Sequence, residues 1–407
     1  MPQASDKKAN PINNLNHPSG LRAEVVDSIA ALEPYRDEWN RLALAAPQKL
    51  PMLSHAWVSS YLENFLNPNE TWCCIFAFDG DQLVGLLPVI ITPFRILGFS
   101  RPRLATPFNL HTFSVDFVST AERQNEIIPF LLTTLFKVQK ASFGFAINRI
   151  PETTPTLDAL ANNIEGAGLI LDFAGYASII KIDGAIDDFH KRLSRNFSRN
   201  LTKAHNKMAK LPNVKTVFLT GADATEKELP LLMKVEASGW KKQEGTAIEQ
   251  SPTLVSFYTA LTKRLSALGW LEWHFLETDS RVIAGQMGVK MGRTLTLFKI
   301  GYDEEYSYCS PGNILFESVV ERAYSEGDTD EINCITDMTW HDNWVMDKRP
   351  HYDLWIYPKH TIPFFFGALP RKARMSISKI AVLKSVYHHA KKLLNLSGRV
   401  AKARKDD

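Results

Sequence analysis

The chain contains few cysteines, and their spacing suits neither a disulfide framework nor a metal site. Only 4 of its 407 residues are cysteine: Cys73 and Cys74 are adjacent, and Cys309 and Cys334 lie far from them. No pair has the two-residue separation that zinc-binding and redox motifs share. Disulfides form in secreted proteins, whereas cysteines that are not paired are typical of proteins in reducing compartments. The sequence therefore predicts a reducing compartment and no bound metal.

Long hydrophobic runs are also absent. The most apolar stretch, residues 83–94, is interrupted by Pro88 and Pro93 and is followed by Arg95. It is too short to span a bilayer, which takes about 20 apolar residues. The first twenty residues are polar and lack the apolar core of a signal peptide. We expect a disordered leader over residues 1–20 and a cytoplasmic protein.

Strong net charge is missing as well, but the charge is unevenly distributed. The formal net charge is +3, while residues 359–407 alone hold 12 Lys and Arg against 2 Asp. Within this basic extension, residues 376–396 have the spacing of an amphipathic helix with lysines on its polar side. Such a helix can lie on an anionic membrane surface, which would make the protein peripheral on the inner membrane face. The alternative is a helix that packs across the body of the protein.

The chain as a whole has the composition of a globular protein, with 45% hydrophobic and 22% charged residues. Its length predicts two or three domains. A hairpin around Asp79-Gly80-Asp81 matches a second hairpin around Asp279-Ser280, and similar helices and strands surround both. The pattern predicts a mixed α+β fold in two similar units, residues 21–182 and 183–358, each a mostly antiparallel sheet flanked by helices, followed by the basic extension at 359–407.

One segment carries most of the functional information. Residues 294–323 predict an apolar strand, a loop, the sequence Ser310-Pro311-Gly312-Asn313, and then a helix. Gly312 permits close approach of a ligand to the backbone, and Pro311 suits the first turn of a helix. The free N–H groups of that turn would form an anion site suited to a diphosphate. An ordinary helix start has the same residue types.

Three segments resemble the GNAT acyltransferase superfamily, in the branch with tandem domains that includes the CelD/BcsL-type acetyltransferases of polysaccharide biosynthesis. They are Glu236 to Gly245, Val282 to Asp303, and Tyr306 to Leu315. The helix at 193–200 resembles the basic helix that opens the family's second domain. The similarity covers roughly residues 180–340 and is weaker in the first half of the chain. Fem-type aminoacyl transferases are more distant relatives.

The resemblance implies an acyl-CoA donor, acetyl-CoA above all. The strand that contains Phe298, Lys299 and Ile300 would present its backbone to the pantetheine arm, and residues 310–313 (Ser310, Pro311, Gly312, Asn313) would hold the pyrophosphate. The superfamily's usual phosphate loop has more glycines than this one. Fem-type relatives use the same slot for a charged tRNA, so that donor stays open.

Direct acyl transfer needs a base near the acceptor. Glu236, on a helix that leads into Trp240, is the first candidate, although it could equally be a surface glutamate. Asp337 and His341 form a second candidate pair after the strand that ends at Ile335, because histidine titrates near neutral pH. The alternative is that Asp337 caps the short helix that follows.

Five residues are candidates for acceptor binding. Trp240 and Lys241 would line a pocket, Gln286 lies in the second hairpin, and His111 and Asp116 of the first unit would close a cleft between the units. Core or surface roles are open for all of them. A basic stripe of Arg195, Arg199, Lys203, Lys207 and Lys210 along one helix would meet an anionic substrate or form a solvated face.

Three functions remain in competition. The first is an acetyl-CoA-dependent acyltransferase that acts on an amine or hydroxyl of a sugar or surface-polysaccharide precursor. The second is a Fem-type transferase that uses aminoacyl-tRNA, the only case that calls for a nucleic acid partner. The third is a scaffold that keeps the fold without the chemistry. The sequence leaves the acceptor and the oligomeric state open.

Overall fold

The computed structural model describes residues 20–96, 98–163, 167–238, 247–279, 281–358 and 364–371. The predicted leader and the amphipathic segment 376–396 therefore lie outside the described residues. The fold is mixed α+β, as the sequence predicts, with one mostly antiparallel sheet flanked by helices. No helix in the described part of the chain is both long and apolar enough to cross a membrane.

The first unit contains seven strands and its own helices. These are β1 (Leu21–Val26), α1 (Ile29–Leu32), α2 (Arg36–Ala45), α3 (His55–Asn64), β2 (Thr71–Asp79), β3 (Gln82–Ile96), β4 (Phe99–Ala105), β5 (Val118–Ser119), α4 (Gln124–Val138), β6 (Phe145–Pro151), α5 (Pro155–Asn163) and β7 (Ala167–Lys181). Ser54 is the N-cap of α3, because its side chain accepts a hydrogen bond from the Trp57 N–H.

The second unit continues from Ile186. It holds α6 (Ile186–Arg192), α7 (Arg195–Met208), β8 (Lys215–Leu219), α8 (Leu229–Glu236), α10 (Pro252–Ala267), β9 (Leu271–Thr278), β10 (Arg281–Met291), β11 (Thr294–Tyr302), α11 (Pro311–Glu326), β12 (Glu331–Asn333) and β13 (Asp347–Pro358). Single-turn helices at Glu304–Cys309 and Thr339–Trp344 lie on either side of α11 and β12.

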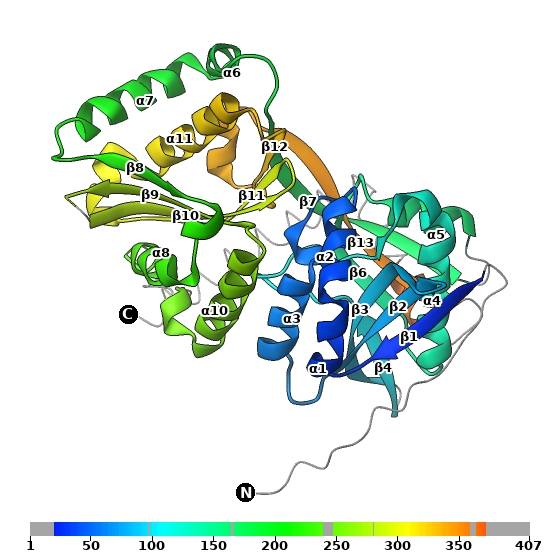
Figure 1. The fold of residues 1–407 in the computed structure, drawn as a ribbon. Coiled ribbons are helices and arrows are strands. Elements are labelled where there is room, and N and C mark those ends of the chain that lie inside the picture. Colours follow the sequence, from blue (N-terminus) through cyan, green and yellow to red (C-terminus); the bar gives the residue numbers. More distant parts are fainter. Residues whose placement is uncertain are drawn as a thin grey trace, which may run out of the picture.

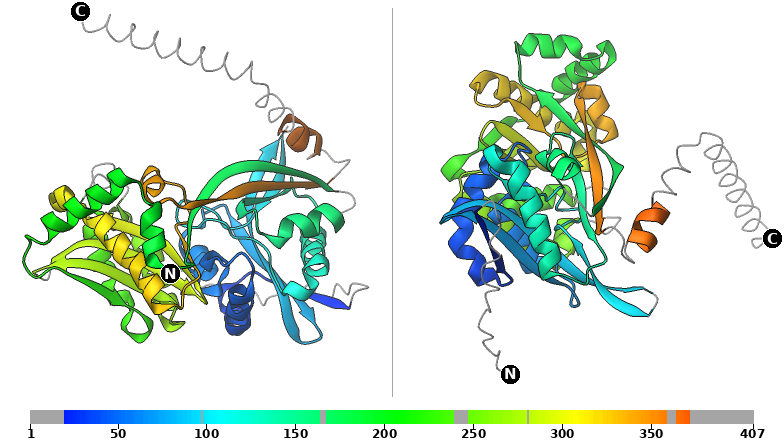
Figure 2. Two further views of the ribbon diagram at one scale, coloured as in Figure 1. Left: turned by 90° about the horizontal axis from the view of Figure 1, so that it is seen from above. Right: turned by 90° about the vertical axis from the view of Figure 1, so that its right-hand side faces the viewer.

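The units share one sheet of 13 strands (Figure 1). Its order among the described residues is β1-β2-β3-β4-β6-β13-β7-β12-β11-β10-β9-β8, with β5 beside β3. The last strand, β13, returns from the second unit and lies between β6 and β7 of the first. In turn, the end of β7 pairs with β12 of the second unit. Figure 2 shows β7 and β13 as a long curved pair that joins the two halves of the molecule.

One apolar core also crosses between the units. It includes Trp39 and Trp57 from α2 and α3 together with Phe257 and Leu261 from α10 and Trp273 from β9. On the opposite face, α4 and α5 cover the sheet of the first unit, and α7 and α11 cover that of the second. The two units therefore form a continuous body (Figure 1).

Two predicted elements have different boundaries in the structure. The sequence alone predicts one long helix over residues 185–210, but the structure has two, α6 and α7, because Ser194 is extended and its side chain caps the N–H of Phe197. The sequence also predicts two strands, at 169–173 and 178–182, where the structure has the single strand β7. A register shift where His351 faces Gly175 lets this strand bend without ending.

Candidate active site

The parallel strands β11 and β12 pair over only three residues. Thr294, Leu295 and Thr296 face Glu331, Ile332 and Asn333, and β11 then continues to Tyr302 without β12 beside it. The chain that leaves β12 follows β7 instead, with Cys334 N–H donating to Ser178 O at 2.9 Å and Ser178 N–H donating to Thr336 O at 3.1 Å. The strands therefore separate, and no strand among the described residues pairs with β11 on the side of β12 beyond Thr296.

A local turn causes this separation. The side-chain oxygen of Asn333 accepts a hydrogen bond from the Ile335 N–H at 2.8 Å. Ile335 has φ of 61°, a left-handed conformation that a β-branched residue rarely adopts. The strained turn bends the chain away from β11, and such strain is concentrated at functional sites in proteins.

A cavity of about 370 Å³ lies where the strands part. Leu297 to Tyr302 form one wall, Cys334, Thr336, Met338, Trp340 and His341 form the other, and Glu236 and Glu304 complete it. The size is within the range of small-ligand pockets. The predicted residues Phe298, Lys299, Ile300, Glu236 and His341 all meet here.

Glu236 reaches the cavity because α8 packs tightly onto β11. A side chain at Gly301 would place its Cβ 2.9 Å from the Cα of Glu236, so only glycine allows this approach. Glu236 is buried, and its carboxylate accepts a hydrogen bond from the Ile248 N–H at 3.0 Å. The structure thus brings a buried carboxylate to the side of the open strand.

The start of α11 lies at the Tyr302 end of the cavity. Ser310 has φ of 51° and turns the chain into the helix at Pro311. Gly312 has an ordinary helical φ, and a Cβ there would only contact the Tyr302 ring at 3.5 Å. The fold itself does not require glycine at this position, so its small size leaves room beside the helix N-terminus. Helix N-termini attract anions.

The second candidate pair is engaged in structural contacts. His341 Nδ1 accepts a hydrogen bond from the Met338 N–H at 3.2 Å. Burial, assisted by the charge of Lys348, lowers the pKa of His341 to about 4, so the ring is neutral at physiological pH. The Asp337 carboxylate accepts hydrogen bonds from Lys348 and Ser178, and the bond from Lys348 holds its pKa below the ordinary value. These contacts hold the loop that forms one wall of the cavity.

A polar contact between the units lies next to the cavity. His111 of the first unit is 2.9 Å from the hydroxyl of Tyr258 on α10, between His111 Nδ1 and the phenol oxygen. The ammonium of Lys299 lies 5.5 Å from the centre of the Tyr258 ring, and Phe298 packs against Trp57 of α3. Burial and the charge of Glu236 raise the pKa of Tyr258 well above its ordinary value, so its hydroxyl keeps its proton.

Tyr258 is a residue that sequence reasoning overlooked. Its helix, α10, follows an ordinary apolar spacing in which Phe257, Tyr258 and Leu261 all read as core. Only the hydroxyl of Tyr258 indicates a partner, because buried tyrosine hydroxyls are usually hydrogen-bonded.

Other predicted residues lie elsewhere. Gln286 is fully buried on β10, and neither atom of its amide has a hydrogen-bonding partner among the described residues. Asp116 is fully buried in the first unit, where it accepts hydrogen bonds from Gln48, Thr154, Thr156 and the Phe117 N–H. Trp240 and Lys241 lie outside the described residues.

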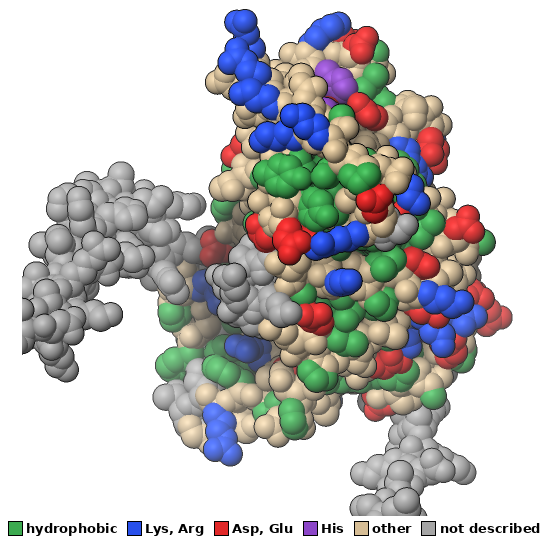
Figure 3. All heavy atoms as spheres, turned by 90° about the vertical axis from the view of Figure 1, so that its left-hand side faces the viewer, with side chains coloured by type: hydrophobic (Ala, Val, Ile, Leu, Met, Phe, Trp, Pro, Cys, Tyr) green, Lys and Arg blue, Asp and Glu red, His purple; other side chains and the backbone are tan. Residues whose placement is uncertain are grey.

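The predicted basic stripe lies on the outer face of α7. Phe197, Leu201, Ala204 and Met208 are buried, which leaves the basic side chains on the opposite face. Figure 3 shows Lys and Arg side chains gathered at the top of the face on which α7 lies. The Lys207 ammonium donates a hydrogen bond to the Tyr308 carbonyl at 2.8 Å, just before the Ser310 turn.

A larger cavity, of about 570 Å³, lies in the first unit. Phe94, Arg103, Tyr357, Phe366 and Arg371 are among the residues that line it. It contains none of the predicted site residues. The smaller cavity at β11 is therefore the better candidate for an active site.

Comparison with known proteins supports this choice. Residues 195–336 match the family described as "Acetyltransferase (GNAT) domain". The chain contains a GNAT acetyltransferase domain. The matched residues include α7, α8, β11, the Ser310 turn, α11 and β12, so the match contains Glu236, the β11 wall of the cavity and, from the opposite wall, Cys334 and Thr336. GNAT domains are acyltransferase domains, so the protein is an acyltransferase. No curated protein sequence matches the chain.

Solved structures with the same fold extend over both units. FemX superposes with a TM-score of 0.56 at 9% identity, covering 82% of this chain and 98% of FemX. The C-terminal domain of a putative lysylphosphatidylglycerol synthetase from Agrobacterium fabrum superposes with a TM-score of 0.50 at 10% identity, covering 81% and 92%. A conserved protein of unknown function from Bacteroides thetaiotaomicron gives 0.52 at 13% identity, covering 82% and 99%. At sequence identities this low, the similarity to these structures shows the fold alone.

Proposed function

We propose that the protein is an acyl-CoA-dependent transferase that moves an acetyl group to an amine or hydroxyl of a sugar, in the class of surface-polysaccharide precursors. The donor would lie along the open edge of β11, with its diphosphate at the N-terminus of α11. The acceptor would enter from the side of the first unit, where His111 meets Tyr258.

The opened strand pair is the observation that carries the proposal. An extended thioester arm needs a groove beside a strand, and β11 borders the cavity over residues 297–302, where β12 no longer pairs with it. A diphosphate needs N–H donors and positive potential, which the Gly312 N–H and the helix dipole offer at the start of α11, beside Tyr302 of the same cavity. The N–H groups of Asn313 and Ile314 donate to the Ser310 carbonyl. Both requirements are met within a single GNAT domain.

The side chains around the cavity favour direct transfer. Cys334 lines the cavity, but burial raises its pKa to about 12, so it is a poor nucleophile. We assign Glu236 the role of base: it would take the proton of the acceptor as the acceptor attacks the thioester carbonyl. The C–S bond then breaks, the acyl group stays on the acceptor, and the CoA thiolate leaves.

The units would position the acceptor together. Lys299 and the His111–Tyr258 pair lie between the two units beside Phe298, a cavity residue. A hydroxylated acceptor needs polar partners of this kind, while Phe298 and Trp57 would give it an apolar wall. The proposed roles of Trp240, Lys241 and Gln286 remain predictions.

Transfer of an aminoacyl group from charged tRNA is the second candidate. It is favoured by the whole-length likeness to FemX and to the domain of a lysylphosphatidylglycerol synthetase, together with the basic outer face of α7. Charged tRNA would bind with a steep salt dependence, because its phosphates release counterions. Acetyl-CoA is a much smaller anion, so its binding would depend only weakly on salt concentration.

A pair of matched variants tests the donor site. Gly312→Phe would fill the space beside the helix N-terminus, whereas Ser325→Phe adds the same ring at the exposed far end of α11. Saturating acetyl-CoA should raise the melting temperature of the wild type and of Ser325→Phe by several degrees, and leave Gly312→Phe unchanged. If acetyl-CoA stabilises all three proteins equally, the donor lies elsewhere. If it stabilises none and charged tRNA binds, the second candidate replaces the first.

A further inference from the structure

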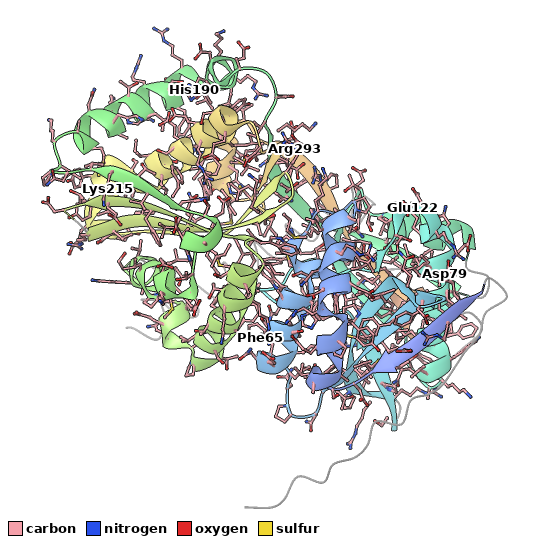
Figure 4. All side chains as sticks on the ribbon, viewed as in Figure 1. Phe65, Asp79, Glu122, His190, Lys215 and Arg293 are labelled. Atoms are coloured by element: carbon pink, nitrogen blue, oxygen red, sulfur yellow. The ribbon has the colours of Figure 1, made fainter. Side chains whose placement is uncertain are left out.

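A cluster of four metal-ligating side chains lies between three helices, away from the cavity. His190 comes from α6, His205 from α7, and Glu317 and Glu321 from successive turns of α11. One ligand atom from each of His190, Glu317 and Glu321 lies within 4.8 Å of the others. His205 Nε2 lies 2.6 Å from a carboxylate oxygen of Glu317. Figure 4 labels His190 on the helix pair α6–α7, above α11.

One nitrogen of this cluster is buried without a partner. His190 Nε2 is closed off from solvent and has no hydrogen-bonding partner among the residues that the structure describes. Buried polar atoms in proteins almost always have a partner, since leaving one unpaired is unfavourable. The atom points to a ligand at this position.

The two glutamates reinforce the argument. Glu317 is largely buried, and Glu321 lies one helical turn further along α11. Two carboxylates held together beside two imidazoles repel each other unless a positive charge lies between them.

We propose that His190, His205, Glu317 and Glu321 bind a divalent transition-metal cation, with Zn²⁺ as the best fit. Two imidazole nitrogens and two carboxylate oxygens give the four ligands that zinc takes in tetrahedral sites. Imidazole ligands disfavour Mg²⁺ and Ca²⁺, which prefer oxygen. The side chain of His205 is 54% exposed, so it can move from its hydrogen bond with Glu317 to a ligand position.

The cation would join the helix pair to the body of the second unit. It would link α6 and α7 to α11, and α7 in turn holds the Tyr308 carbonyl through Lys207. The sequence predicts no metal, because the ligands are spread over three helices and no short motif contains them. Only the Glu317–Glu321 spacing, one helical turn, is visible in the sequence. The site does not depend on the proposed transferase activity.

Zinc titration of the full-length, chelator-treated protein tests the site. Isothermal titration should show one tight equivalent of Zn²⁺ in the wild type and binding at least about tenfold weaker in His190→Ala and in Glu321→Gln. Glu326→Gln is the matched control, because Glu326 lies on the same helix but bonds Arg322 outside the cluster. This variant should bind as the wild type does.

A second readout covers the case of a variant that folds poorly. Zn²⁺ should raise the melting temperature of the wild type and of Glu326→Gln, but not of Glu321→Gln, whose side chain is exposed and tolerates change. The proposal is overturned if the wild type binds no stoichiometric Zn²⁺. It is equally overturned if Glu321→Gln and His190→Ala bind Zn²⁺ as tightly as the wild type.

Discussion

The sheet contains two parallel strand pairs, one in each unit, and they differ in what lies beyond their point of contact. In the first unit, β4 meets β6 at Leu104 and Ala105, which face Phe145 and Ala146. In the second, β11 meets β12 over three residues. Both pairs are short, so both units contain a point at which parallel strands stop pairing.

Beyond β6, the first unit is closed by a buried polar network. Thr154 and Thr156, which follow β6, donate hydrogen bonds to the carboxylate of Asp116, and Gln48 donates a third at 3.0 Å. Phe117 packs edge-on against Phe145. The 570 Å³ cavity of the first strand pair lies at the contact itself, where Leu104, Phe145 and Ala146 line it, whereas the 370 Å³ cavity of the second unit lies beyond the contact, along residues 297–302 of β11. Similar strand pairs can thus serve either as scaffold or as binding site, depending on the segment that follows.

The largest effect expected of a single substitution comes from removing the network of the first unit. Asp116→Ala should leave Thr154, Thr156 and Gln48 buried without their acceptor, at a cost of about 3–5 kcal/mol in the free energy of unfolding. Asp81→Ala, in an exposed turn, should cost almost nothing. Urea denaturation measures both. If the first strand pair is only scaffold, acetyl-CoA still stabilises the folded Asp116→Ala protein. Loss of acetyl-CoA binding in this variant would instead place Asp116 in the donor site.

The next effect concerns acid. Burial lowers the pKa of His55, His341 and His351 to about 4 each. Because the unfolded chain binds protons near pH 6.5 and the folded one does not, their contribution to stability is fully present above pH 6.5. It is lost as the pH falls from 6.5 to 4, by about 1.4 kcal/mol per pH unit for each histidine.

His341→Gln isolates the contribution of the cavity wall to this loss of stability. The glutamine oxygen can still accept from the Met338 N–H, but it does not titrate. The slope of unfolding free energy against pH between 4 and 6.5 should fall by about one histidine's share. An unchanged slope would show that the pKa of His341 is not lowered in the folded protein.

A smaller effect is expected where the units meet. Tyr258→Phe removes the hydroxyl that hydrogen-bonds His111, which should cost about 1 kcal/mol of stability. Acetyl-CoA binding should persist while the rate of transfer falls, because the hydroxyl lies on the acceptor side. Tyr176→Phe, at an exposed side chain, is the control. Equal transfer rates in both variants would remove Tyr258 from the site.

The smallest effect is expected from the ion pair between Arg264 of α10 and Glu63 of α3. The two side chains form two contacts, at 2.6 and 2.9 Å, and both are partly exposed. Exposed ion pairs contribute less than about 1 kcal/mol and weaken with salt. Arg264→Met should therefore lower stability slightly at low salt and hardly at all at high salt. A loss of several kcal/mol would mean that charge, rather than the shared core, holds the units together.

Local features of the second unit were predictable from the sequence. The strand at 294–302, the turn at Ser310 and the helix from Pro311 have strong local signals, namely an apolar run, Pro at the first helical position and periodic apolar residues. Their relation in space also followed from the GNAT resemblance, and the structure places Glu236, Phe298 and His341 around one cavity.

Features that depend on distant partners were not predictable. β13 begins with Asp347, Lys348 and Arg349, which no strand pattern favours, and it is a strand because β6 and β7 pair with it on both sides. Tyr258 finds its partner 147 residues away in His111. The zinc ligands, too, come from three helices. Tertiary contact, rather than local pattern, defines all of these.

Hydrogen–deuterium exchange with and without acetyl-CoA tests the central claim most directly. We predict that the donor slows exchange of the amides at 297–302 and 312–314, and leaves those at 104–106 and 145–148 unchanged. Slower exchange at the first strand pair, or no change at the second, would contradict the assignment of the open edge of β11 as the donor site.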